Sequence, residues 1–109
     1  MTDKIVVLTA CDSEKQAEKL AHTLVDQHLA ACVNILPKGR SIYRWEGKIE
    51  DSTEWLLLIK SRRDLFTTLR AEIQRVHSYE VPEVVAIPVV DGSEAYLGWL
   101  DGQLITPVE

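Results

Sequence analysis

Residues 48–61 read KIEDSTEWLLLIKS, a stretch without glycine or proline that decides how this chain folds. Such a run predicts one long β-strand, which would extend roughly 45 Å at about 3.3 Å per residue. A compact chain of this length has a radius of gyration of about 13 Å, and hence a diameter of about 34 Å. We therefore expect one end of the strand to project beyond the domain, unless the strand bends back near Asp51-Ser52.

The residues before this strand predict a partner strand that pairs with it as a hairpin. Glu46-Gly47 is a turn sequence, and Ile42–Trp45 before it reads as extended structure. An earlier segment, Ala31–Ile35, reads as the start of the same strand, and Pro37 and Gly39 then interrupt it. These two residues predict a bulge or bend at a sheet edge.

The N-terminal residues predict a strand followed by a helix. Ile5–Ala10 is a short apolar run rich in β-branched residues, which is typical of a buried strand. Ser13 with Gln16 three residues later forms a capping box. Apolar residues then recur at three- and four-residue spacing, which predicts a helix that ends around Leu29.

The residues after the long strand predict a helix, a strand and a short terminal helix. Ser61 and Asp64 resemble a helix cap, and residues 65–76 carry an apolar stripe at helical spacing. Val84–Val90 is the most hydrophobic run of the chain and reads as a buried strand. The last helix is expected from Ser93, which caps it, to Gly102, which ends it.

This order of elements predicts an α+β fold. Strand, helix, strand, strand, helix and strand with right-handed crossovers form a ferredoxin-like sandwich. We expect a four-stranded antiparallel sheet with both helices on one face, a long hairpin between the second and third strands, and a short C-terminal helix. The 109 residues fit a single domain over positions 1–109.

Composition narrows the class of protein. The net charge of −5 without a basic block argues against nucleic acid and anionic membranes as partners. No apolar run approaches the roughly 18 residues that span a bilayer. The N-terminus lacks a signal-peptide pattern, and two cysteines, Cys11 and Cys32, do not make a disulfide scaffold or a zinc motif. We therefore expect a reduced, cytoplasmic protein.

The projecting hairpin predicts self-association. Its end would carry Ile42, Tyr43, Trp45 and Ile49 into water, and monomers rarely tolerate such a patch or a long free strand edge. The simplest way to bury this patch and strand edge is against another copy of the chain. We expect Tyr43, Trp45, Trp55 and Trp99 to serve packing and the subunit interface.

The strongest candidate for a functional site is the segment between the second long helix and the last strand. His77, Tyr79, Glu80 and Glu83, which can ligate a metal or exchange a proton, crowd into seven residues. Pro82 stiffens this connection. The segment is either a pocket at the rim of the core or an ordinary helix-to-strand connection with solvated acids.

Other candidates carry weaker signals. Cys11 follows the first strand, where the chain exits the sheet, whereas Cys32 is expected to be a small core residue of the second strand. His22 and His28 lie on different faces of the first helix and fit structural or solvated roles. Arg62-Arg63 could meet an anionic ligand, although such pairs are usually solvated. The sequence has neither a phosphate-binding glycine loop nor a nucleophile elbow, so nothing in it requires catalysis.

Four blocks, in order, resemble the CutA family of divalent-cation-tolerance proteins: LAACVNI at 29–35, SIYRWEGKI at 41–49, HSYEVPE at 77–83 and YLGWL at 96–100. The resemblance covers nearly the whole chain. It implies a ferredoxin-like protomer in a tight homotrimer, with the long hairpins packed between subunits. It also implies a role in tolerance of copper and other divalent metals, with copper(II) binding and no established catalytic activity.

The resemblance also implies a metal site, from which this chain departs. A copper site proposed for bacterial members uses a cysteine that leaves strand one and two adjacent histidines at the end of helix two. His77 matches the second histidine, but Val76 stands at the first, and Thr9 occupies the place of the cysteine, two residues before Cys11. The expected ligands of a weakly bound copper(II) or similar ion are His77, then Cys11, with Glu80 or Glu83 as oxygen donors.

Three alternatives remain open from the sequence. A PII-like trimeric signalling module would bind a small ligand in clefts between subunits, in contact with Arg62, Arg63 and residues 77–83. A small ferredoxin-like enzyme, such as an isomerase, would use His77 as a base. A rigid scaffold would have no ligand of its own.

Overall fold

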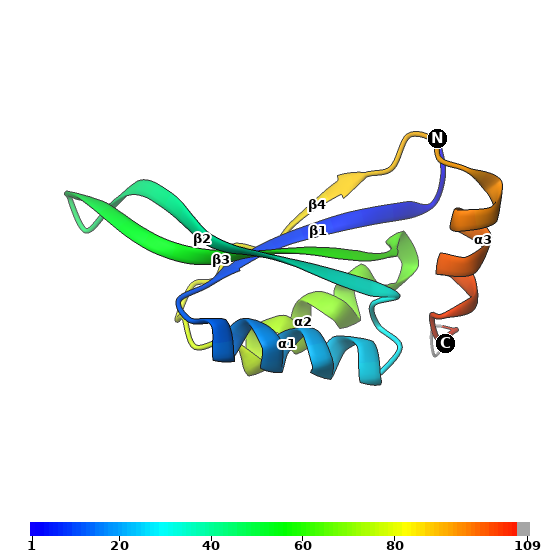
Figure 1. The fold of residues 1–109 in the computed structure, drawn as a ribbon, viewed down its shortest axis with the longest axis horizontal. Helices are drawn as coiled ribbons and strands as arrows, with labels where there is room; N and C mark the ends of the chain where they lie inside the picture. The colour runs from blue at the N-terminus through cyan, green and yellow to red at the C-terminus, as the bar shows by residue number, and fades with distance from the viewer. Residues whose placement is uncertain (107–109) are drawn as a thin grey trace.

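A four-stranded antiparallel sheet with two helices against one face forms the body of the protein, in a computed structural model that describes residues 1–106 (Figure 1). The strand order β2-β3-β1-β4 is that of the predicted ferredoxin-like sandwich. Within residues 1–106, no helix is long and apolar enough to cross a membrane. The elements are β1 (Lys4–Cys11), α1 (Glu14–Asp26), β2 (Cys32–Trp45), β3 (Lys48–Arg62), a 3-10 turn (Arg63–Leu65), α2 (Phe66–Val76), β4 (Val85–Pro88) and α3 (Glu94–Gly102).

The core lies between the sheet and the helices α1 and α2. β1 pairs with β3 from Lys4 opposite Arg62 to Cys11 opposite Trp55. Because side chains alternate between the faces of a sheet, every second residue of these strands points toward the helices. Those side chains pack with the apolar stripes of α1 and α2, and the fully buried ones include Val7, Leu20, Leu24, Leu57, Ile59, Leu69 and Ile73.

The opposite face of the sheet is apolar and incompletely covered. It carries the alternate residues of the same strands, such as Leu8 opposite Leu58. Leu36, Val85 and Ile87 on the outer strands have 43%, 48% and 45% of their surface exposed. An apolar sheet face of this kind is normally buried against another layer.

The β2–β3 hairpin projects past the body, as its length predicted. The chain measures 43 Å along its longest axis against 26 and 23 Å along the others, and Figure 1 shows the hairpin beyond the helices. β3 runs unbroken, with Asp51 opposite Ile42 and Ser52 opposite Ser41, so the alternative of a bend at these residues is wrong. The predicted interruption in β2 is a register shift between Leu36 and Gly39.

The capping predictions were right for α1 and α3 and wrong for α2. Ser13 accepts a hydrogen bond from the Gln16 amide at 3.1 Å, and Ser93 caps α3 in the same way. Ser61 instead lies within β3, where its buried hydroxyl donates to the carbonyl of Leu29. Asp64 accepts from Arg62 rather than from an amide of the helix, so α2 begins at Phe66 after a 3-10 turn.

Two element boundaries also differ from the predictions. α1 ends at Asp26 rather than near Leu29, because His28 takes a left-handed conformation with φ of 58°. β4 covers Val85–Pro88 rather than 84–90, and its residues are exposed, not buried. This strand is hydrophobic because it lies at the edge of the uncovered apolar face.

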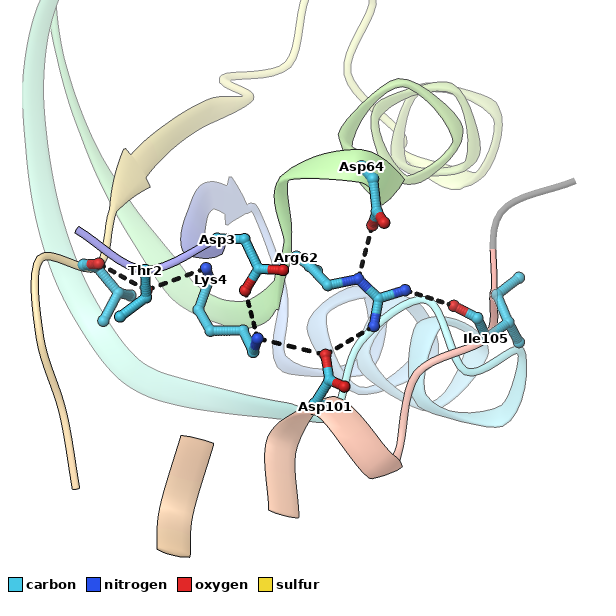
Figure 2. Close-up of polar contacts among 8 residues, drawn as sticks. Thr2, Asp3, Lys4, Arg62, Asp64, Asp101 and Ile105 are labelled. Carbon is cyan, nitrogen blue, oxygen red and sulfur yellow. Dashed lines mark hydrogen bonds and ion pairs between the residues drawn. The ribbon is translucent and has the colours of Figure 1, made fainter. Parts of the chain in front are cut away.

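An ionic cluster fastens α3 to the end of the sheet (Figure 2). Arg62 donates to Asp64, to Asp101 at 2.9 Å and to the carbonyl of Ile105, and Lys4 lies 3.3 Å from the same Asp101 oxygen. Arg62 and Lys4 are each only 8% exposed. Arg62 is therefore not solvated, and it pairs with carboxylates of the chain itself, whereas Arg63 is exposed.

Candidate functional site

His77 ends α2 and turns back onto the sheet, where both of its ring nitrogens are engaged. Nε2 lies 2.7 Å from the carbonyl oxygen of Ala10, and Nδ1 lies 3.0 Å from the backbone nitrogen of Tyr79. The carbonyl can only accept and the amide can only donate, so the pair of contacts requires a neutral ring that carries its proton on Nε2. The imidazole is buried, with 8% of the residue exposed.

Cys11 is brought to His77, as expected, but in an environment that opposes its ionisation. Its sulfur lies 3.8 Å from His77 Nε2, and the residue is fully buried. Burial, followed by the charges of Asp12 and Glu54, raises the pKa of the thiol to about 11. The thiolate is the form that binds a metal, so Cys11 is a poor ligand at neutral pH.

Tyr79 connects His77 to a buried carboxylate. Its ring lies 4.7 Å from the imidazole, centre to centre, and its hydroxyl donates to Glu54 at 2.6 Å. Burial, then the hydrogen bond and charge of Glu54, raise the pKa of Tyr79. Glu54 is 8% exposed, and sequence reasoning did not identify it. The available signal was a lone acid directly before the apolar run Trp55–Ile59.

A pocket of about 540 Å³ opens beside this group, between the hairpin and the turn that follows α2. Glu80 and Glu83 are exposed and line it, so the structure places them on the pocket rather than around Cys11 and His77. The other lining residues come from β1, the hairpin and the turn: Ala10, Ser41, Tyr43, Trp45, Glu54, Ser78, Tyr79 and Val81.

The four expected metal ligands do not form a ready cluster. Among the described residues, no group of three or more His, Cys, Asp or Glu side chains is placed to hold a metal ion. Thr9, at the position of the family's cysteine, is fully buried, and its hydroxyl has no hydrogen-bond partner within the described chain. The structure therefore pairs Cys11 with His77 and separates them from the acids.

The remaining candidates divide between surface and core. Tyr43, Trp45 and Trp99 are 43%, 47% and 47% exposed, whereas Trp55 packs partly buried against the core. His22 is exposed, and His28 lies outside α1 with Nδ1 2.9 Å from the carbonyl of Gln103. Cys32 is half-buried in β2.

Comparison with known proteins decides the family. The family described as CutA1 divalent ion tolerance protein matches residues 5–103. The chain belongs to the CutA1 family. Relatives of this CutA1 chain include the divalent-cation tolerance protein CutA of Thermus thermophilus, which is 45% identical over 95 residues, with 87% of this chain and 92% of the relative covered.

Other CutA relatives are longer. Protein CutA of Homo sapiens is 46% identical over 83% of this chain, and the chloroplastic Protein CutA of Arabidopsis thaliana is 45% identical over 88%. This chain spans about half the length of these two relatives, 50% and 53% respectively.

Solved CutA structures share the fold. The Cut A1 protein of Thermus thermophilus superposes with a TM-score of 0.90 at 42% identity, covering 93% of this chain and 98% of its own. CutA1 of Oryza sativa gives a TM-score of 0.93 at 38% identity, with 95% of both chains covered. The ferredoxin-like arrangement predicted from element order is confirmed by these neighbours.

Proposed function

We propose that this CutA1-family chain is a non-enzymatic homotrimer that binds divalent cations, copper(II) among them, weakly beside His77. The observation that carries the proposal is the neutral, buried imidazole of His77 next to a pocket lined by Glu80 and Glu83. A neutral imidazole suits copper or zinc, whereas a site of carboxylates alone suits magnesium or calcium. The family's description as a divalent ion tolerance protein agrees with such binding.

The donor set accounts for weak binding. A metal at Nδ1 would displace the Tyr79 amide, and a metal at Nε2 would displace the proton held by the Ala10 carbonyl. Cys11 would have to lose a proton that burial holds firmly. We therefore assign His77 as the first ligand, Glu80 or Glu83 as oxygen donors, and Cys11 as the least favourable of the four.

Calorimetric titration of copper(II) into the reduced protein at neutral pH tests this assignment. We expect His77→Ala to weaken binding at least tenfold, which corresponds to about 1.4 kcal/mol. His22→Ala is the matched control, because His22 is an exposed histidine of α1 that could bind copper without specificity. Equal binding by wild type and His77→Ala, with both variants folded, would contradict the site.

The homotrimer is proposed from the surface of the chain. The exposed residues at the end of the hairpin, Ile42 and Ile49 among them at 67% and 69%, and the uncovered sheet face both require a partner layer. Another copy of the chain satisfies both surfaces. Light scattering at micromolar concentration tests this proposal, and a monomeric mass would contradict it.

We place the protein in the cytoplasm, although a CutA neighbour from Archaeoglobus fulgidus is described as periplasmic.

A signalling module of the PII type is a second candidate, favoured by the pocket itself. Its volume of about 540 Å³ lies in the range of small-molecule sites. Arg62 cannot serve this function as first expected, because Asp64 and Asp101 hold it. A thermal-shift screen with nucleotides separates this function from metal binding, since a ligand selective for the native state raises the melting temperature.

A further inference from the structure

Glu54 is a buried charge that lacks an opposite charge. Lys4, Arg62 and Glu54 are equally buried, each 8% exposed. Lys4 and Arg62 share Asp101 as an ion-pair partner, whereas Glu54 has no ion pair within the described residues. Instead, Glu54 accepts a hydrogen bond from the neutral Tyr79 hydroxyl. Buried carboxylates are normally paired with a cation. Glu54 is therefore the residue to which a cationic ligand would supply the opposite charge.

The pocket beside Glu54 has the electrostatic character of a cation site. Glu54, Glu80 and Glu83 line it, and among the described lining residues there is no lysine or arginine. A cation that enters the pocket would be attracted, and an anion would be repelled.

The aromatic lining of the pocket suits an organic cation. Tyr43, Trp45 and Tyr79 line the same pocket as the three glutamates. Aromatic rings attract alkylammonium groups through their quadrupole and stabilise them most where water is excluded.

We propose that this pocket binds a small alkylammonium cation, with Glu54 as the counter-charge and Tyr43, Trp45 and Tyr79 as the aromatic surroundings. Glu80 and Glu83 at the pocket add to its negative potential. The volume of about 540 Å³ accommodates a ligand larger than a single ammonium group. The inference rests on Glu54 and the aromatic residues and not on His77, so it stands or falls separately from metal binding.

Tetramethylammonium chloride is the probe, and tert-butanol is its neutral counterpart of similar size. Both are titrated into the full chain at constant ionic strength with EDTA present, and the indole N–H signals are followed by NMR. We expect the ammonium to bind at least tenfold more tightly than tert-butanol and to shift the Trp45 signal, which Trp45→Phe assigns. Equal binding of both probes would show an apolar pocket only and would overturn the proposal.

Two variants locate the charge and the aromatic contribution. Glu54→Gln keeps an acceptor for Tyr79 and should weaken ammonium binding at least tenfold, while Glu18→Gln, an exposed acid on α1, should leave it unchanged. Trp45→Leu, at a side chain that is 47% exposed, tests the aromatic contribution and should also weaken ammonium binding, so the proposal stays testable if Glu54→Gln fails to fold. Undiminished binding by these variants, or no binding by wild type, would overturn the proposal. A changed oligomeric state of Glu54→Gln without ammonium binding would mean that a second copy supplies the cation.

Discussion

His77 was the residue that stood out in the sequence, and its surroundings change what it can do. Histidine is a common metal ligand because one ring nitrogen is usually free to coordinate. Here the Ala10 carbonyl and the Tyr79 amide occupy both nitrogens. The residue is therefore structural in the described chain, and it would be able to bind a metal only after one contact is released. Residue type alone could not distinguish these two states.

Cys11 should be inert toward alkylating reagents in the folded protein. It is fully buried and its pKa is raised to about 11, so at pH 8 the reactive thiolate is about a hundredfold rarer than for an ordinary thiol near pKa 9. Iodoacetamide labelling followed by peptide mass spectrometry measures this directly. The urea-unfolded protein is the control, in which Cys11 should label fully. Labelling of Cys11 at equal rates with and without urea would contradict the burial argument.

At the scale of single elements, α2 carries a pH-dependent contribution to stability. Arg75 donates to both carboxylate oxygens of Glu72, at 2.6 and 2.9 Å. These bonds, with a further one from Gln27, lower the pKa of Glu72 from 4.5 to about 2. The folded state therefore keeps Glu72 ionised at a pH where the unfolded chain has bound a proton.

We expect this contribution to be complete above pH 4.5 and to be lost as the pH falls toward about 2. The measurement is the free energy of unfolding from urea denaturation between these two pH values. Glu72→Gln removes the titrating group, so its stability should fall less steeply with acid than that of wild type. Parallel pH profiles for the two proteins would show that the ion pair does not contribute.

The hairpin turn is a second element, at which a substitution can raise the stability of the protein. Glu46 and Gly47 have φ of 50° and 79°, the left-handed pair of a type I′ turn. Asn-Gly is preferred at such positions, because asparagine tolerates positive φ better than glutamate does. Glu46→Asn should therefore raise the free energy of unfolding by about 0.5–1 kcal/mol, a fraction of the usual strain of a left-handed residue.

Glu50→Asn is the control for this substitution. It makes the same chemical change at an extended position of β3, where asparagine is disfavoured and no gain is expected. Both variants are compared by urea unfolding at one protein concentration. A gain for Glu50→Asn as large as that for Glu46→Asn would attribute the effect to lost charge and not to the turn.

The local sequence predicted well which segments form helices, strands and turns, and in which order. The N-cap at Ser13, the turn at Glu46-Gly47 and the glycine-free β3 are local signals, and the structure confirms each, although the Gln16 side chain bonds the Val76 carbonyl and does not complete the capping box. The cap predicted at Ser61 was wrong because β3 continues to Arg62 and turns the hydroxyl toward Leu29. Strand length is set by pairing with β1, which a local pattern does not contain.

At the scale of the whole molecule, the uncovered sheet face is the surface on which the proposed assembly depends. Leu58 lies on this face in the centre of β3, opposite Leu8 of β1. If this face is buried between subunits, Leu58→Asp would place a carboxylate against apolar side chains at a cost of several kcal/mol. We expect it to convert the proposed trimer to a smaller species in size-exclusion chromatography with light scattering.

Thr68→Asp is the control for this test. It adds the same charge on the exposed surface of α2, away from the sheet, and should leave the mass unchanged. A Leu58→Asp variant that is folded and keeps the mass of wild type would show that another surface holds the subunits together.

The sequence by itself determined the order of elements and the projecting hairpin, because periodicity, capping and turn chemistry act between near neighbours. It also pointed to the family, through the resemblance of four blocks to CutA proteins. Only the tertiary structure decided the surroundings of His77, the burial of Arg62 and the pocket at Glu54. Each depends on contacts between distant residues, such as His77 with Ala10 and Arg62 with Asp101, 67 and 39 positions apart. Those contacts follow from strand register and helix packing, which place a side chain in a charged, apolar or open environment that its own neighbours in sequence do not specify.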